Sequence, residues 1–203
     1  MSTFKFENNI KLDKKIESQF VKLSQEIEKA SSDIRTIAVT SSNNEEGKTF
    51  VSFHLACALA KKGYRVLIVM ADMRKTTVIK DMPIMGIVDI VEGKAEMDEV
   101  IYNTDIENID VIFSGATKKD DILDIARGVY GVMIKCLKDD YNYIIVDMPT
   151  ILKTDNDEVL LREADAGIIV IQPNRSSKKK IETNIKMIEA YNCKVLGAIL
   201  NQR

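Results

Sequence analysis

Short apolar segments alternate with helical segments along most of the chain, and this alternation limits the fold more than any other feature of the sequence. The apolar segments are rich in Val and Ile, as strands are when both faces of a parallel sheet are buried. They are Ile34–Thr40, Arg65–Asp72, Ile109–Gly115, Tyr141–Pro149, Ala166–Pro173 and Lys194–Arg203. Helical patterns separate them, including a short one near Val88–Val91 and a longer one at Ser176–Asn192. The sequence therefore predicts a doubly wound, three-layer α/β domain, with helices on both faces of a mostly parallel sheet.

The first part of the chain, residues 1–33, is polar and charged, with apolar residues at helical spacing. These residues are Leu12, Ile16, Phe20, Leu23 and Ile27. The spacing predicts an amphipathic helix of about four turns. Such a helix is equally compatible with self-association and with packing on its own domain. Residues 34–203 contain no repeat, linker or low-complexity segment, so we expect them to form one domain.

The composition excludes several classes of function. The 203 residues include 29 Lys and Arg against 31 Asp and Glu, a net charge of -2, which gives no general attraction to nucleic acid. The absence of Trp also disfavours surfaces on which bases stack. No apolar run approaches the roughly 20 residues that span a bilayer, and the N-terminal residues lack the pattern of a secretory signal. We therefore expect a cytoplasmic protein that does not bind nucleic acid.

The segment IRTIAVTSSNNEEGKTFVSFHLA has the order strand, polar loop, Gly47-Lys48-Thr49, helix. A phosphate-binding loop needs this order, because backbone N–H groups at a helix N-terminus point at phosphates. The lysine reaches the terminal phosphates and the threonine hydroxyl binds the metal. The general pattern GxxxxGK[ST] has Gly where this chain has Ser42, and GK[ST] alone also occurs by chance in ordinary turns. The position at the first strand-to-helix junction favours the nucleotide site.

Two of the apolar strands end in carboxylates. Arg65–Asp72 ends with Asp72, followed by Arg74, and Tyr141–Pro149 contains Asp147 near its end. In a parallel sheet, ligands bind beyond the carboxyl ends of the strands, near the point where the strand order reverses. Either acid alone would be read as a turn or cap residue. Together with GKT they predict a Mg²⁺ site beside the phosphate loop.

Together these segments resemble the cytoplasmic kinase domain of the bacterial tyrosine kinases (BY-kinases), which control capsule and exopolysaccharide synthesis. That family carries a phosphate loop, a motif of three apolar residues followed by DxDxR, and a third strand that ends in Asp-x-Pro. The counterparts here are SSNNEEGKT, LIVMADMR and IIVDMP. The resemblance continues through GIVDIVEG to the terminal KVLGAILN, and so extends from about Ile16 to Asn201.

The resemblance implies ATP or ADP and Mg²⁺ as ligands, and it assigns roles by position. Lys48 would contact the β- and γ-phosphates, Thr49 the Mg²⁺, and Asp147 the metal or its waters. Asp72 takes the place of the second acid of DxDxR, with Arg74 as its Arg. The implied catalytic residues are Lys48, Asp72, Arg74 and Asp147, and the implied metal ligands are Thr49, Asp72 and Asp147. The implied nucleotide-binding residues are Asn43, Asn44, Glu45, Glu46, Gly47, Lys48, Thr49, Phe50 and Asn201, the last where related ATPases read adenine.

The chain departs from the family pattern at residues close to the chemistry. The first acid of DxDxR, which in the family accepts the tyrosine proton and organises the metal, is Met70 here. A thioether is a poor ligand for a hard cation. Asn44-Glu45 replaces the usual Pro-Gly of the loop. A carboxylate about 4 Å from a phosphate would cost on the order of 1 to 4 kcal/mol unless Glu45 points to solvent.

Three hypotheses that include a nucleotide follow, and the alternative to all of them is a pure binding module that binds no nucleotide. The first is an ATP-binding protein-tyrosine kinase of the capsule and exopolysaccharide type, with weakened phosphotransfer. The second is a catalytically inactive, nucleotide-binding regulatory subunit. The third is a partitioning-type P-loop ATPase, which is disfavoured because the position of its second, signature lysine is Asn43. The resemblance also implies a homo-oligomer, and a membrane-anchored activator that recruits the chain to the inner face of the plasma membrane.

Overall fold

The computed structural model describes residues 12–71, 84–115, 120–151 and 155–202. Within them, seven strands form one sheet in the order β3-β4-β2-β5-β1-β6-β7. The strands are β1 (Thr36–Ser41), β2 (Val66–Met70), β3 (Ile101–Asn103), β4 (Ile109–Phe113), β5 (Tyr143–Asp147), β6 (Ala166–Ile171) and β7 (Lys194–Leu200). All neighbouring strands are parallel except β3 and β4. The predicted doubly wound α/β fold is confirmed.

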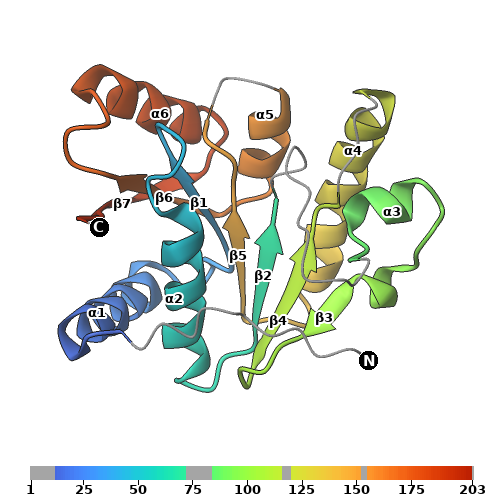
Figure 1. The fold of residues 1–203 in the computed structure, drawn as a ribbon, viewed down its shortest axis with the longest axis horizontal. Helices are drawn as coiled ribbons and strands as arrows, with labels where there is room; N and C mark the ends of the chain where they lie inside the picture. Colours follow the sequence, from blue (N-terminus) through green and yellow to red (C-terminus); the bar gives the residue numbers. More distant parts are fainter. Residues whose placement is uncertain (1–11, 72–83, 116–119, 152–154, 203) are drawn as a thin grey trace.

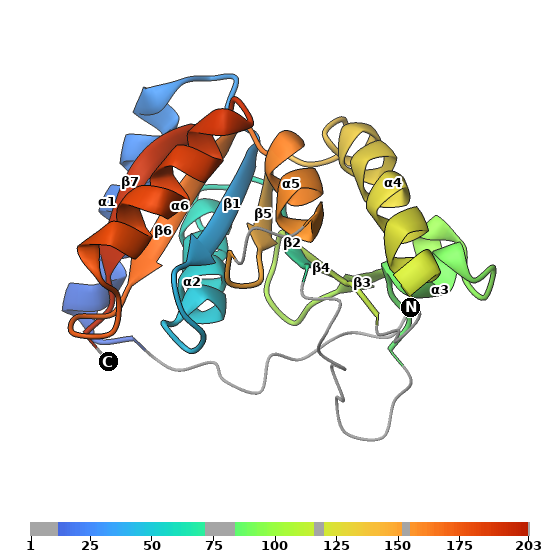
Figure 2. The ribbon, with the colours of Figure 1, turned by 90° about the horizontal axis from the view of Figure 1, so that it is seen from above.

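Helices cover both faces of this sheet (Figures 1 and 2). They are α1 (Lys14–Ala30), α2 (Lys48–Ala60), α3 (Ile87–Val91), α4 (Asp120–Leu137), α5 (Asp155–Arg162) and α6 (Lys178–Ala190). Because successive strand residues point to opposite faces, Ile68 and Ile145 join the core under α1 and α2. Their neighbours Leu67 and Ile144 join the core under α4, α5 and α6. Strands β1, β2, β4, β5 and β6 are thus buried on both sides, which explains their continuous apolar sequences. The prediction was wrong for β7, which lies at the edge of the sheet and is half-buried to exposed.

Two elements differ from the prediction. Strand β3 adds an antiparallel edge beside β4, and a short 3-10 helix, η1 (Met97–Glu99), precedes it. The residues of β3, Ile-Tyr-Asn, are half-buried or exposed, so they lack the apolar run by which the other strands were predicted. The short helix expected near Val88–Val91 is present as α3.

Helix α1 packs against α2 on one side of the domain. Asp13 caps its N-terminus by accepting a hydrogen bond from the Lys15 backbone N–H at 2.9 Å. Phe20 is buried, and its ring lies 6.1 Å from that of Phe50 and 5.5 Å from that of His54. The apolar face predicted for this helix therefore contacts its own domain. Whether the same helix also contacts a second subunit stays a prediction.

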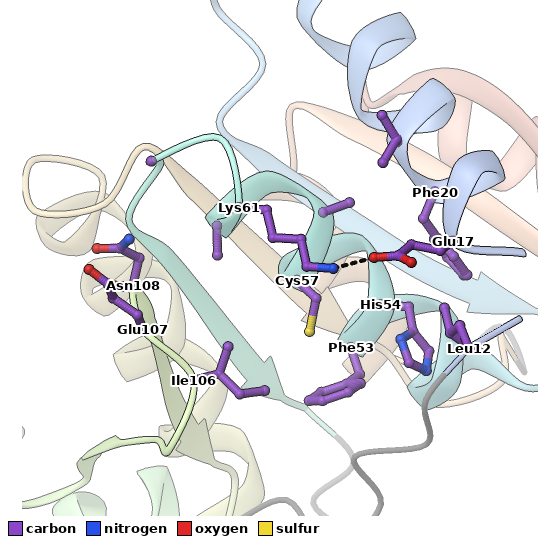
Figure 3. A pocket seen from close by; sticks show the side chains of 14 residues that line it. Leu12, Glu17, Phe20, Phe53, His54, Cys57, Lys61, Ile106, Glu107 and Asn108 are labelled. Atoms are coloured by element: carbon purple, nitrogen blue, oxygen red, sulfur yellow. Dashed lines mark hydrogen bonds and ion pairs between the residues drawn. The ribbon is translucent and has the colours of Figure 1, made fainter. Parts of the chain in front are cut away.

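A cavity of about 640 Å³ lies between α1, α2 and the turn before β4, away from the N-terminal end of α2 (Figure 3). Phe20, Phe53 and Cys57 contribute apolar lining, and the ion pair between Lys61 and Glu17 spans one side. His54 is 7% exposed and its ring centroid lies 5.0 Å from that of Phe53. His54 is therefore a packing residue of this aromatic cluster. Among the described helices, none is both long and apolar enough to cross a bilayer.

Candidate functional site

The phosphate loop lies where the strand order reverses. Strand β1 sits between β5 and β6, and the chain crosses to β2 on one side before it returns to β6 on the other. A crevice at the carboxyl ends of the strands forms at such a point. The loop leaves β1 at Ser42 and enters α2 at Lys48, so the N-terminus of α2 lies at this crevice. The sequence predicted the loop at this first strand-to-helix junction.

Gly47 turns the loop into the helix. Its φ of 93° lies in the left-handed region, which favours glycine. A Cβ on Gly47 would lie 2.1 Å from Nδ2 of Asn201, so a side chain there would have to displace that amide. That amide donates a hydrogen bond to the backbone carbonyl of Glu46 at 2.9 Å. Asn201, which follows β7, therefore lies against the phosphate loop, and its amide holds the loop backbone. Its predicted contact with adenine stays a prediction.

Lys48 and Thr49 lie in the first turn of α2 and point toward the strand ends. Lys48 Nζ donates hydrogen bonds to Ser41 Oγ at 3.0 Å and to Thr150 Oγ1 at 3.2 Å. The Thr49 hydroxyl donates to Asp147 Oδ2 at 2.6 Å. The structure therefore brings together an ammonium, a hydroxyl and a carboxylate at the N-terminus of one helix. This is the combination that the sequence predicted.

Asp147 is 7% exposed and ends β5. Its second oxygen, Oδ1, accepts a hydrogen bond from Ser52 Oγ at 3.3 Å. Met70 ends β2 directly beside it, since the two residues are partners in the parallel register. Met70 also packs on the apolar core that faces α2, the side toward which Asp147 points. The thioether therefore stands next to the carboxylate that would support the metal.

Glu46 is fully buried although it lies in a polar loop. Its Oε2 accepts hydrogen bonds from the backbone N–H groups of Ser42 and Asn43, both at 3.0 Å, and its Oε1 accepts one from Ser176 Oγ at 2.6 Å. Burial by itself would raise the pKa of Glu46, but the hydrogen bonds from Ser176 and Asn43 outweigh it, so the pKa is lowered. Glu46 thus braces the loop from inside.

Glu45 has the opposite environment. Its side chain is 85% exposed and lies 3.9 Å from Arg175. The backbone of Glu45 adopts φ of 60°, a left-handed conformation for which the glycine of the related motif is better suited. The side chain therefore points to solvent, and the repulsion expected from a carboxylate facing a phosphate is avoided.

Asn43 connects the loop to the start of α6. Its Nδ2 donates to Ser176 Oγ at 2.7 Å and to the Arg175 carbonyl at 3.0 Å. Its Oδ1 accepts a hydrogen bond from Lys180 Nζ at 2.9 Å. Asn184, buried on α6, donates to Ser42 Oγ at 3.0 Å. The sequence analysis missed Ser176, Asn184 and Thr150, because their contacts join segments more than 100 residues apart.

The remaining predicted residues have different outcomes. The ring of Phe50 packs 4.3 Å from that of His54, so its side chain belongs to the aromatic cluster, and only its backbone lies at the helix start. Asn44 accepts a hydrogen bond from the Thr150 hydroxyl at 2.8 Å. Asp72 and Arg74 lie outside the described residues.

The donor set fits a magnesium-bound nucleotide. The first N–H groups of a helix lack partners within the helix and favour anions, and Lys48 adds a positive charge beside them. Thr49 and Asp147 supply oxygen atoms, which Mg²⁺ prefers, and Mg²⁺ in such sites keeps several waters. Within the ranges that the structure describes, no group of three or more His, Cys, Asp or Glu is placed to hold a metal ion.

Comparisons with known proteins agree with this geometry. Residues 34–197 match the family model described as "AAA domain". The chain is 27% identical over 193 residues to the tyrosine-protein kinase CpsD of Streptococcus pneumoniae, covering 93% of this chain and 85% of that protein. The chain belongs to the AAA-domain family and is of its bacterial tyrosine kinase type. The resemblance inferred from the motifs is therefore confirmed.

Solved structures show the same architecture. The chimerical protein CapA2B2 superposes with a TM-score of 0.80 at 26% identity, over 92% of this chain and 84% of that one. The septum site-determining protein MinD of Pyrococcus horikoshii, complexed with Mg-ADP, has a TM-score of 0.69 at 26% identity, over 82% of this chain and 70% of that one. The P-loop NTPase fold is thus shared with a nucleotide-bound relative.

Proposed function

We propose that this chain binds Mg-ATP and Mg-ADP at the loop of residues 42–49, and that it is a protein-tyrosine kinase of the capsule and exopolysaccharide type with weakened phosphotransfer. The observation that carries the proposal is the contact between Thr49 and Asp147 at the helix N-terminus, with Met70 beside Asp147. Thr49 and Asp147 supply oxygen atoms for the metal of a metal-bound nucleotide. Met70 stands where the family has a carboxylate close to the transferred phosphate.

Each residue has a distinct role in this proposal. The N–H groups around Gly47 and the ammonium of Lys48 hold the phosphates, with Lys48 on the β- and γ-phosphates. Thr49 and Asp147 hold Mg²⁺, which neutralises charge on the phosphate oxygens. Asp72 supplies the remaining acid, with Arg74 beside it in sequence. Asn201, after the last strand, contacts the adenine base, the role that the family resemblance implies for its position.

The reduced rate follows from the chemistry at position 70. A general base contributes typically 10²–10⁴-fold, whereas most phosphoryl-transfer catalysis comes from positioning and electrostatics. The Met70 side chain can neither accept a hydroxyl proton nor bind a hard cation well. Loss of that carboxylate should therefore slow transfer while nucleotide binding persists. If transfer is lost altogether, the chain is a pseudokinase that only binds nucleotide. This is the second candidate function, and Met70 favours it for the same reason.

The cellular setting follows from the family resemblance. We infer that the chain is a cytoplasmic subunit, self-associates, and is recruited to the plasma membrane by a separate membrane-anchored activator of polysaccharide export. The similarity to CpsD of Streptococcus pneumoniae over 85% of that protein supports this assignment. A partitioning-type ATPase is less well supported, since Asn43 replaces the signature lysine and its amide is bound to Ser176.

The test has two steps. Calorimetric titration with Mg-ADP should show saturable binding to the wild-type chain, and no heat and no saturation up to millimolar ligand would contradict the nucleotide site. Transfer of labelled phosphate from Mg-ATP to a tyrosine peptide is then compared among wild type, Met70→Asp and the apolar control Met70→Leu. We expect Met70→Asp to raise the transfer rate by at least about tenfold, within the range of a general base, and Met70→Leu to leave it unchanged.

The outcomes separate the candidates. Wild-type transfer at rates of roughly 1–100 s⁻¹, ordinary for kinases, would refute the weakened activity. Nucleotide binding without transfer in wild type and Met70→Asp alike would favour the pseudokinase.

A further inference from the structure

Thr150 lies at the phosphate loop although none of the motifs includes it. It follows the end of β5 by three residues and is 3% exposed. Its Oγ1 accepts a hydrogen bond from Lys48 Nζ at 3.2 Å and donates one to Asn44 Oδ1 at 2.8 Å. One buried hydroxyl thus contacts both the loop lysine and the loop residue that replaces the usual proline.

The protons of this contact can be assigned. A hydroxyl has one hydrogen to donate and two lone pairs. Because Thr150 donates its hydrogen to Asn44, only lone pairs remain for the ammonium of Lys48. Ser41 is arranged in the same way, since its Oγ donates to the Asn43 carbonyl at 2.6 Å and accepts from Lys48 at 3.0 Å. Two oriented hydroxyls therefore hold two of the three N–H groups of the ammonium.

We propose that Thr150, oriented by Asn44, is a positioning residue that directs the ammonium of Lys48 toward the terminal phosphates of the nucleotide. The inference rests on the proposed nucleotide site and specifies how this chain holds its lysine. A proline at position 44 would offer no side-chain acceptor, so the hydroxyl of Thr150 would lose the partner that orients it. The pair Asn44 and Thr150 is therefore a feature of this loop sequence and not of the Pro-Gly loop that it resembles.

The test compares two substitutions of Thr150 in the full chain. Thr150→Val keeps the shape and removes the hydroxyl, whereas Thr150→Ser keeps the hydroxyl. Calorimetric titration with Mg-ADP should give a Kd about tenfold higher for Thr150→Val, the effect of one lost hydrogen bond to a charged group. Thr150→Ser should bind as the wild type does. Thermal unfolding of the ligand-free proteins shows whether each variant is folded.

A second variant keeps the proposal testable if Thr150→Val does not fold. Asn44 is exposed, so Asn44→Ala leaves the core intact. It should also raise the Kd about tenfold, because the freed hydroxyl hydrogen can turn toward the ammonium. Since both residues act through one contact, the double variant should bind about as weakly as either single variant.

Several results would overturn the inference alone: wild-type affinity in Thr150→Val or in Asn44→Ala, equal losses in Thr150→Ser and Thr150→Val, or additive losses in the double variant. Failure of the wild-type chain itself to bind Mg-ADP would overturn the proposed nucleotide site, and this inference with it. The two failures are therefore distinguishable from one set of titrations.

Discussion

Replacing Glu46 by alanine should destabilise the whole domain, although the residue lies in a loop. The carboxylate is fully buried and accepts the backbone N–H groups of Ser42 and Asn43, both at 3.0 Å. Glu46→Ala leaves both donors without that partner. A buried donor left unpaired costs about 1–3 kcal/mol. Ser42 is 8% exposed and Asn43 is half-buried, so water can partly replace the second partner. The free energy of unfolding should therefore fall by about 2–4 kcal/mol.

Urea unfolding followed by circular dichroism measures this change, and the neighbouring Glu45→Ala is the matched control. Glu45 carries the same charge in the same loop, but its side chain is 85% exposed and contacts only the exposed Arg175 among the ion pairs of the described residues. An exposed ion pair of this kind contributes little. The reasoning is refuted if Glu46→Ala and Glu45→Ala have the same midpoint and slope.

The effect of Glu46 should also depend on pH. Hydrogen bonds lower the pKa of Glu46 in the folded protein relative to the unfolded chain. A carboxylate of this kind contributes stability that is fully present above its unfolded pKa and is lost as the pH falls through its folded pKa. The stability difference between wild type and Glu46→Ala should therefore be constant around neutral pH and shrink in acid. A difference that grows in acid would contradict the assigned direction.

Two further predictions concern α1 and α2. Phe20→Ala should lower the free energy of unfolding by about 3 kcal/mol. This is the lower end of the range for a buried phenylalanine, because a cavity already adjoins the ring. Urea unfolding measures the change, and an unchanged midpoint would show that α1 does not stabilise the domain. Burial raises the pKa of the Cys57 thiol to about 11. At pH 8 iodoacetamide should therefore modify the exposed Cys136 well before Cys57, as followed by mass spectrometry. The rate of Cys57 modification should still rise above pH 10. Equal rates for the two cysteines at pH 8 would contradict the raised pKa of Cys57.

The fold could be predicted because its signal is local. Continuous Val and Ile runs arise when a strand is buried on both faces, and Gly47-Lys48-Thr49 directly after such a run fixes the phosphate loop. The edge strand β3 was missed because its three residues, Ile-Tyr-Asn, carry no such run. The order of the strands was not predicted either, since alternation of strands and helices is the same for many orders.

The side-chain contacts of the site could be predicted only in part. Thr49 and Asp147 were paired because parallel strands end at one edge of the sheet, and their hydroxyl and carboxylate meet at 2.6 Å. The contact of Asn201 with Gly47 depends on how β7 pairs with β6, which contains a register shift. A glutamate in a polar loop is ordinarily exposed to solvent, so the burial of Glu46 could not be predicted from the residues next to it in the sequence.

The phosphate loop of this chain is held from two sides by residues that its motif does not contain. On the side of α6, Ser176 and Asn184 hold Glu46 and Ser42. On the side of β5, Thr150 holds Asn44. A Pro-Gly loop is stiffened by its own backbone, because proline fixes φ and glycine accepts the left-handed conformation without strain. With Asn44 and Glu45 in those places, the loop has lost that local stiffness, and its shape depends on hydrogen bonds from distant segments. Changes in α6 or after β5 should therefore alter nucleotide affinity even though they touch no phosphate.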